Sequence, residues 1–321
     1  MNANNNILQV ENLKTWFPIK KGLLRRTAGY VRAVDDVSFE IPAGSTFGLV
    51  GESGSGKTTT ARTIARLIPA TSGKVIFEEK SILNLHQSKL RNIRKDISYV
   101  FQDPYSSLNP RMTVGSILAE PLRVHKIAKG SELIDRITSL LKKVGLQPSH
   151  INRYPHEFSG GQRQRIGIAR ALALEPKLVI CDEPVSALDV SIQSQILNLL
   201  KDLQEQFNLT YLFIAHDLSV VEFISDKVAV MYMGKIVEIA PSAILYEKPL
   251  HPYTKLLLSA IPRPIPERIK TTSQHILGGK DYPDGCPFLG RCPIADGFCC
   301  KHIPELRQVE PGHSVACLKV K

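Results

Sequence analysis

The chain has 321 residues, a length that accommodates one large domain or two modest ones. Its composition, 43% hydrophobic and 22% charged, supports a substantial core and excludes wholesale disorder. The net charge of +11 permits an acidic partner, such as a nucleotide, a nucleic acid or a lipid surface, without choosing among them. We expect neither a signal peptide nor a transmembrane segment, because the required apolar runs are missing from the sequence.

Short apolar runs separated by turn residues open the chain. Residues 31–34 and 37–41 indicate β-strands, a turn over 42–44 follows, and residues 46–50 form another apolar strand. A basic stretch over 20–32 interrupts this pattern. It predicts a long hairpin or loop.

Further along, helical and extended patterns alternate. Residues 131–145 carry apolar side chains at helical spacing and end at a glycine. Residues 178–181 and 211–215 are apolar runs too short for helices, which is typical of buried parallel strands. Between them, residues 192–207 show helical periodicity. This strand–helix–strand order predicts an α/β fold with helices on the faces of a sheet.

A phosphate-binding motif follows the strand that ends at Val50. Residues 51–58 read GESGSGKT, which fits G-x-x-x-x-G-K-[ST], and a helix is predicted over 59–67. Glycines let backbone N–H groups close around phosphates, and the helix N-terminus adds positive potential. Lys57 is expected to reach the β- and γ-phosphates, and the Thr58 hydroxyl to ligate Mg²⁺. The candidate phosphate-binding residues are Gly51, Ser53, Gly54, Ser55, Gly56, Lys57, Thr58 and Thr59.

Two further motifs belong with a phosphate site. Asp182 and Glu183 end the apolar run 178–181; in a P-loop fold the first holds Mg²⁺ and the second can polarise the attacking water. A helix predicted over 163–174 follows a short glycine motif, and small residues at a helix start expose backbone donors to a phosphate. A Gly-Gly pair alone is usually only a turn. The motif consists of Ser159, Gly160, Gly161 and Gln162.

These motifs occur in an order that resembles the ABC-type ATPases. The order is the phosphate loop, Gln102, the 159–162 motif, the acidic pair, residues 186–189 and His216. The resemblance spans about residues 7–260. It implies an ABC-type P-loop ATPase domain over 1–260, with a mixed sheet core, an antiparallel β subdomain and a helical subdomain at about 103–175. It also implies ATP and Mg²⁺ as ligands.

The resemblance also implies roles for single residues. Two such domains would pair head to tail, so that each ATP lies between one partner's phosphate loop and the other's residues 159–162. Glu183 would be the general base, His216 the switch at the γ-phosphate, and Gln102 the sensor near Mg²⁺ and the water. Thr58, Gln102 and Asp182 would surround Mg²⁺. Asp189 would cross the dimer interface.

An aromatic residue usually stacks on adenine upstream of the phosphate loop in this family. Tyr30 is the candidate here, although the basic stretch shifts the spacing. Trp16 and Phe17 compete with it, and ordinary packing explains these aromatics equally well. Base stacking needs only a π face, so the three stay open.

Longer phrases narrow the resemblance. Residues 101–112, 181–192, 251–257 and the tail from 285 resemble the ATP-binding subunits of bacterial dipeptide/oligopeptide ABC importers. The sequence of residues 109–115 and the basic stretch resemble those of the subunit usually lettered F. This implies a peripheral protein at the cytoplasmic face of the membrane, driving peptide uptake. Nickel and glutathione importers share most of these phrases.

The partners implied are a related second ATPase subunit, two membrane permeases and an external solute-binding protein. A homodimer is possible in isolation, and no nucleic acid is expected. A soluble ABC ATPase of translation or DNA repair usually has two fused halves or a coiled-coil insertion, and the sequence shows neither. A small-molecule kinase or GTPase does not explain the 159–162 motif, the acidic pair or His216.

The cysteines gather near the C-terminal end. A Pro-rich linker is predicted over 261–282, and a Cys-rich module over 283–321. Five, six and seventeen residues separate successive members of the candidate ligand set, whereas zinc sites usually begin with cysteines two to four apart. Four thiolates on irregular loops favour a [4Fe–4S] cluster, with Zn²⁺ or unligated thiols as alternatives. The set is Cys286, Cys292, Cys299 and Cys317.

Cys300 competes with Cys299 for the third position. In the importer family the third cysteine tends to precede a proline by five positions, with a leucine two beyond. Cys299, Pro304 and Leu306 reproduce that spacing. The resemblance therefore favours Cys299.

Overall fold

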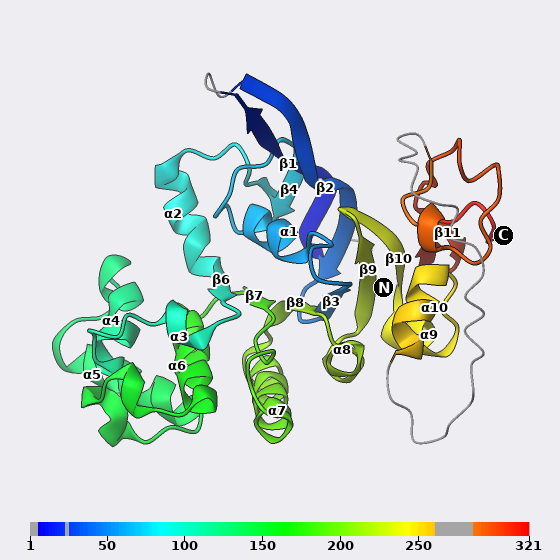
Figure 1. Ribbon diagram of the computed structural model, residues 1–321. Helices are drawn as coiled ribbons and strands as arrows, with labels where there is room; N and C mark the ends of the chain where they lie inside the picture. Colours follow the sequence, from blue (N-terminus) through cyan, green and yellow to red (C-terminus); the bar gives the residue numbers. More distant parts are fainter. Residues whose placement is uncertain (1–5, 23–25, 261–284, 321) are drawn as a thin grey trace.

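The protein consists of an antiparallel sheet, a mixed sheet and a group of helices at one side of the mixed sheet (Figure 1). The computed structural model describes residues 6–22, 26–260 and 285–320. The linker predicted over 261–282 lies outside these residues. The predicted domain boundaries stay predictions.

An antiparallel sheet holds the N-terminal strands. The described residues order it as β2-β1-β4-β5. β1 and β2 pair out to Lys21 and Arg26, so residues 20–21 and 26–32 of the basic stretch lie in two paired antiparallel strands, while residues 23–25 lie outside the described part of the chain. The runs predicted as separate strands at 31–34 and 37–41 lie in one strand, because the chain passes Asp36 through a shift of register rather than a turn. The strands are β1 (Asn6–Lys21), β2 (Arg26–Pro42), β4 (Ser72–Phe77) and β5 (Lys80–Ser81).

A mixed sheet forms the core, as expected. In the described residues its order is β11-β12-β10-β9-β3-β8-β7-β6. The run from β9 to β6 is parallel, whereas β10, β12 and β11 pair antiparallel. The strands are β3 (Thr46–Val50), β6 (Ile97–Val100), β7 (Leu178–Asp182), β8 (Thr210–Ala215), β9 (Lys227–Tyr232), β10 (Lys235–Pro241), β11 (Arg307–Glu310) and β12 (His313–Val315).

Both faces of the mixed sheet are covered. Along β8, Tyr211 and Phe213 join one apolar cluster, while Leu212 and Ile214 join another. Successive side chains of a strand point to opposite faces, so a strand covered on both sides reads as a continuous apolar run. The first cluster also contains residues of helices, and the second also contains residues of the antiparallel sheet.

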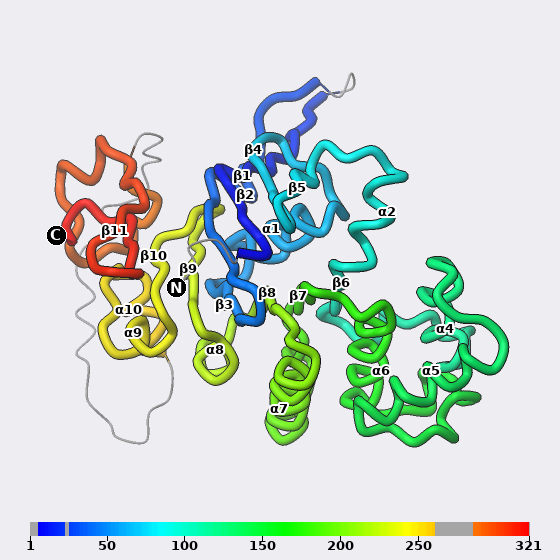
Figure 2. Tube along the Cα trace, turned by 180° about the vertical axis from the view of Figure 1, so that it is seen from behind, coloured from blue at the N-terminus to red at the C-terminus, as the bar shows by residue number. Residues whose placement is uncertain are grey.

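The helices surround this sheet, with α3 to α6 gathered to one side (Figures 1 and 2). Four predicted helices are found: those at 59–67, 131–145, 163–174 and 192–207 correspond to α1, α5, α6 and α7. In the part of the chain that the structure describes, no helix is both long and apolar enough to cross a membrane. The helices are α1 (Lys57–Ile64), α2 (Gln87–Asp96), α3 (Pro104–Ser107), α4 (Val114–Val124), α5 (Gly130–Lys143), α6 (Gly160–Leu172), α7 (Val190–Phe207), α8 (Leu218–Ile224), α9 (Ser242–Glu247) and α10 (Pro252–Ser259), with 3₁₀ turns η1 (Pro148–Asn152), η2 (Pro155–Glu157) and η3 (Leu289–Arg291).

The C-terminal segment, residues 285–320, is attached to the core sheet. β12 pairs with β10 and so extends the sheet at its edge. Glu238 of β10 and His313 of β12 are both fully buried, with Oε1 and Nε2 2.8 Å apart. The Glu238 carboxylate also accepts from the backbone N–H groups of Leu250 and His251, at 2.7 and 2.9 Å. One buried carboxylate therefore ties β12 and the start of α10 to the sheet.

We expect Glu238→Ala to lower the free energy of unfolding by about 3 kcal/mol or more. The change leaves two buried donors and one half-buried donor, the Leu250 N–H, without an acceptor, at about 1 kcal/mol or more each. Urea or thermal unfolding measures the loss. The matched control is Glu247→Ala, at an exposed carboxylate of α9, which should change stability by less than about 0.5 kcal/mol. A loss that small for Glu238→Ala would contradict the assigned role.

Candidate active site

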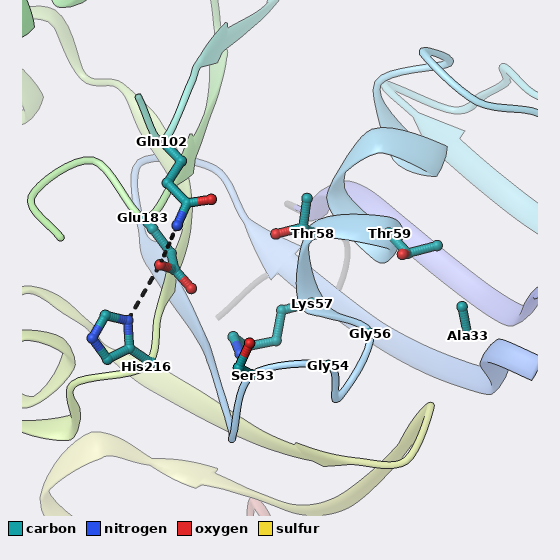
Figure 3. Close-up of a pocket in the computed structure, with 10 residues that line it drawn as sticks. All are labelled: Ala33, Ser53, Gly54, Gly56, Lys57, Thr58, Thr59, Gln102, Glu183 and His216. Carbon is teal, nitrogen blue, oxygen red and sulfur yellow. Dashed lines mark hydrogen bonds and ion pairs between the residues drawn. The ribbon is translucent and has the colours of Figure 1, made fainter. Parts of the chain in front are cut away.

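A cavity of about 420 Å³ lies where strands of the mixed sheet end. The phosphate loop follows β3, Gln102 follows β6, Glu183 follows β7 and His216 follows β8. Ligands of α/β sheets bind at the carboxyl ends of strands, and this volume suits a small molecule. Figure 3 shows the lining residues: Ala33, Ser53, Gly54, Gly56, Lys57, Thr58, Thr59, Gln102, Glu183 and His216.

The backbone of the phosphate loop requires glycine at two positions. Gly51 has φ +150° and Gly56 has φ +108°, and residues that carry a side chain rarely adopt such backbone angles. A Cβ at Gly51 would lie 2.2 Å from the carbonyl oxygen of Met231, and one at Gly56 2.1 Å from that of Ala33. The loop is therefore packed against β9 and β2, which fixes its path into α1.

Lys57 begins α1 and turns back over the loop. Its Nζ donates to the carbonyl oxygens of Gly51 and Glu52, at 2.7 and 2.9 Å. Burial lowers the pKa of this ammonium, while the nearby charges of Glu183 and Asp182 act in the opposite direction. The Lys57 ammonium is thus hydrogen-bonded to the loop itself, and a bound phosphate would compete with the loop carbonyls for it.

Asp182 lies just behind the cavity wall and is almost fully buried. Thr58 Oγ1 donates to its Oδ1 at 2.8 Å, and the Tyr99 hydroxyl donates to its Oδ2 at 2.7 Å. The structure thus joins Thr58 and Asp182, two of the three residues predicted around Mg²⁺, while the third, Gln102, contacts Glu183 instead. Tyr99 was not among the predicted residues, because its position in β6 beside β7 follows from a strand register that sequence spacing does not reveal.

Glu183 brings the three predicted catalytic residues together. Its Oε2 accepts from Gln102 Nε2 at 2.8 Å and lies 3.2 Å from His216 Nδ1 (Figure 3). Glu183 has φ +47°, a left-handed conformation that costs a residue with a side chain some strain and is frequent at functional sites. Its side chain is 13% exposed, against 55% for His216. The carboxylate is therefore held between two polar side chains and faces the same cavity as Lys57.

The 159–162 motif does not line this cavity. Ser159 caps α6: its hydroxyl accepts from the backbone N–H of Gln162, and the Gln162 side chain accepts from the Ser159 N–H. Gly160 and Gly161 form the first turn of the helix. Asp189 caps α7 through its carboxylate alone, which accepts from the Ile192 N–H, and this hydrogen bond lowers its carboxyl pKa. Both motifs sit at helix starts away from the cavity wall.

The remaining nucleotide candidates take other places. Gly51 and Ser55 belong to the loop but not to the cavity wall. Tyr30 is 55% exposed on β2, with its ring 6.1 Å from that of Trp16. Neither these aromatics nor Phe17 lines the cavity. Ala33, which does line it, was missed because alanine carries no chemical signal.

The four predicted cysteine ligands line one small cavity of about 10 Å³. Cys300 lies outside its wall, with Sγ 3.6 Å from the carbonyl oxygen of Asp296. Burial raises the pKa of Cys286 to about 11 and also raises those of Cys292 and Cys299. Within residues 6–22, 26–260 and 285–320, no group of three or more His, Cys, Asp or Glu side chains is arranged around one metal ion.

We expect Tyr99→Phe to raise the Mg²⁺ concentration needed for half-saturated nucleotide binding by about tenfold, the lower end for losing a hydrogen-bond partner of a metal ligand. A Mg²⁺ titration of nucleotide binding measures the shift. Tyr211→Phe is the control, since its buried hydroxyl donates to the carbonyl oxygen of Leu200, which is not a residue of the site. The same Mg²⁺ response in both variants would exclude Tyr99 from positioning Asp182.

Comparison with known proteins identifies the family. The ABC transporter family matches residues 34–186, and the C-terminal region of oligopeptide/dipeptide transporters matches residues 237–299. The chain is 52% identical over 317 residues to the oligopeptide transport ATP-binding protein AppF of Bacillus subtilis (strain 168), covering 97% of this chain and 96% of AppF. It is also 52% identical over 310 residues to the glutathione import ATP-binding protein GsiA of Escherichia coli O157:H7, covering 97% of this chain and 48% of GsiA.

A solved structure agrees with these sequence matches. The dimeric, post-hydrolysis ATP-binding cassette MJ0796 bound to ADP and Pi aligns with a TM-score of 0.65 at 30% identity, covering 73% of this chain and 98% of that one. The sequence motifs, the strand-end cavity and the two family matches agree. The chain belongs to the ATP-binding proteins of the ABC transporter family, in the group that carries the oligopeptide/dipeptide transporter C-terminal region.

Proposed function

We propose that this chain is the ATP-hydrolysing subunit that powers uptake of dipeptides and oligopeptides through a membrane ABC importer. The observation that carries the proposal is the contact of Gln102 and His216 with Glu183, in a cavity shared with Lys57 and Thr58. The relative AppF, named as an oligopeptide transport protein, supports the cargo class.

Several polar side chains at the cavity have distinct roles in the proposed reaction. The attacking water gives a proton to the Glu183 carboxylate as its oxygen bonds to the γ-phosphorus, and the bond to the β–γ bridging oxygen breaks to release ADP and phosphate. Gln102 and His216 orient that carboxylate. Lys57 leaves the loop carbonyls for the β- and γ-phosphates. Thr58 and Asp182, with Gln102 nearby, would hold Mg²⁺, which would supply positive charge to the phosphates.

The complete site is proposed to need two chains. The residues from 159 to 162 and Asp189 lie outside the cavity of their own chain, which is what a head-to-tail pair requires. The loop of one chain and residues 159–162 of the other would then enclose ATP. The partner is a related ATPase subunit, with a homodimer possible in isolation.

Two permeases and an external solute-binding protein complete the proposed machine, with this chain peripheral at the cytoplasmic face. Residues 103–125, which include α3 and α4, would face a cytoplasmic helix of the permease. Pro104 begins α3 and Pro121 lies within α4; with Pro110 they stiffen the surface.

Tyr30 remains the proposed partner of adenine. Its exposed ring leaves a face free, whereas the Arg32 guanidinium lies 4.8 Å from the centre of the Trp16 ring. Phe17 is also exposed and stays the competing choice.

Glu183→Gln is expected to bind ATP nearly as the parent does and to lower ATP hydrolysis by about 10²–10⁴-fold, because the amide cannot accept the proton. In cells that express the permeases and the solute-binding protein, uptake of a labelled oligopeptide should stop. Glu205→Gln, at an exposed carboxylate of α7, is the control and should retain both activities. Hydrolysis at the parent rate by Glu183→Gln would remove Glu183 as the base, and normal hydrolysis without peptide uptake in the parent would remove the transport assignment.

Glutathione import is the second candidate, favoured by the 52% identity to GsiA. The same uptake assay separates the two. Competition by unlabelled glutathione, with none by oligopeptides, would favour this alternative. Nickel uptake is tested in the same way.

We also propose that residues 283–321 form a Cys-rich module around a [4Fe–4S] cluster held by Cys286, Cys292, Cys299 and Cys317. The support is that all four thiols line one cavity, while Cys300 does not. A cluster takes one thiolate per iron, so its cysteines need not converge on a single point. The cavity has room for about one water molecule, so loading requires the loops to open and the thiols to lose their protons. The cluster would staple a segment too short to bury much core.

Anaerobically purified full-length protein is expected to be brown, to absorb broadly near about 400 nm, and to hold about four irons per chain. Cys299→Ser should lose the colour, whereas Cys300→Ser should keep it. Colourless anaerobic protein with stoichiometric zinc would favour the zinc alternative, and metal-free protein with a folded C-terminal segment would favour unligated thiols.

A further inference from the structure

The C-terminal segment reaches into the phosphate loop at Glu52. Arg291, in η3, donates from Nη1 to Glu52 Oε2 at 2.8 Å and from Nη2 to Oε1 at 2.7 Å. This is a two-pronged pairing of guanidinium and carboxylate, the most directional ion pair available to side chains. It lowers the pKa of the Glu52 carboxyl, so that the carboxylate form persists. Arg291, which is 239 positions away in sequence, thus binds the second residue of the loop, Glu52.

A second contact from the C-terminal part of the chain holds the backbone of the same residue. The Glu52 N–H donates to the Tyr253 hydroxyl at 2.9 Å. Tyr253 is fully buried, and its ring lies 4.6 Å from that of Tyr232 and 5.5 Å from that of Phe288. The hydroxyl is therefore fixed in place by packing. Arg291 lies over the same aromatic group, about 6 Å from each ring centre.

Lys57 supplies the third bond to Glu52, through the carbonyl oxygen at 2.9 Å. This bond cannot persist when Lys57 turns to a phosphate, because the same ammonium is needed there. The contacts that remain on Glu52 are the Ser55 N–H within the loop, which donates to the Glu52 carbonyl oxygen at 3.2 Å, and the side chains of Tyr253 and Arg291 from outside the loop. Those contacts do not involve the cavity, so nucleotide need not displace them.

We propose that Arg291 is a positioning residue for the phosphate loop. Its fork on Glu52, together with the Tyr253 hydroxyl, keeps the first peptide of the loop in its nucleotide-binding conformation when Lys57 moves to the phosphates. The C-terminal region thereby contributes to nucleotide affinity without touching the nucleotide. The proposal requires that the loop binds a nucleotide, and it is independent of the cargo and of any cluster at the cysteines.

The first test is the affinity of the full-length chain for ADP, which binds without turnover. Arg291→Ala should raise the dissociation constant about threefold to fivefold, the upper range for a partly exposed ion pair. Arg291→Lys keeps the charge but lacks the planar fork, and about a twofold rise is expected. The matched control is Lys248→Ala, which removes another exposed ion pair to the C-terminal segment, Lys248 Nζ to Glu310 Oε1 at 2.6 Å, without touching the loop. Unchanged ADP affinity in folded Arg291→Ala, or an equal loss in Lys248→Ala, would overturn the proposal.

A double-mutant cycle with Glu52→Ala supplies a second readout. If Arg291 acts through Glu52, the double variant should bind ADP no more weakly than the weaker single variant. Additive losses would overturn the proposal, since they would mean that the two residues act separately. The exchange of both residues, Glu52→Arg with Arg291→Glu, should restore part of the lost affinity and also serves if a single variant fails to fold. In the assembled importer, Arg291→Ala should raise the KM for ATP while kcat stays within about twofold, whereas a smaller folded fraction would lower kcat alone.

Discussion

Parallel pairing of the central strands is the constraint on which the site depends. Val50 pairs with Ala215, Val100 with Cys181, and Asp182 with Ile214, so the strands end at nearly the same level. The residue that follows each strand end is therefore placed at one edge of the sheet. A phosphate loop, a glutamine, a glutamate and a histidine that are distant in sequence meet there.

Local motifs predicted much of this arrangement because they carry their own context. The phosphate-loop motif predicts a strand before it and a helix after it, and both are found. The apolar runs over 178–181 and 211–215 correspond to strands that are buried on both faces. Contacts between neighbouring strands and between the two sheets could not be predicted from the sequence. The contact of Tyr99 with Asp182 and the place of Ala33 in the cavity wall depend on strand register and on packing between the two sheets, neither of which leaves a periodic signal.

The C-terminal strands illustrate the same limit. β11 and β12 are short, and β11 is mostly exposed, so no alternation of apolar and polar residues marks them. They form because β10 offers a free edge and because Glu238 needs donors in an apolar surrounding. The sequence patterns predicted a segment organised by its cysteines. The described structure adds a second organising element, a strand pairing with a buried carboxylate at its centre.

The strand order of the mixed sheet has a consequence for how the chain is made. β10 is synthesised well before β12, so the edge that β12 later covers stays open while the intervening residues emerge. An open edge with unpaired N–H and C=O groups is a template for pairing with other chains. During this interval the Glu238 carboxylate has the Leu250 and His251 N–H groups within the chain already made, but not His313, which arrives with β12. An inward-pointing charge of this kind at a strand edge disfavours pairing with other chains. The same side chain that later joins the segment to the core thus protects the nascent sheet until the segment arrives.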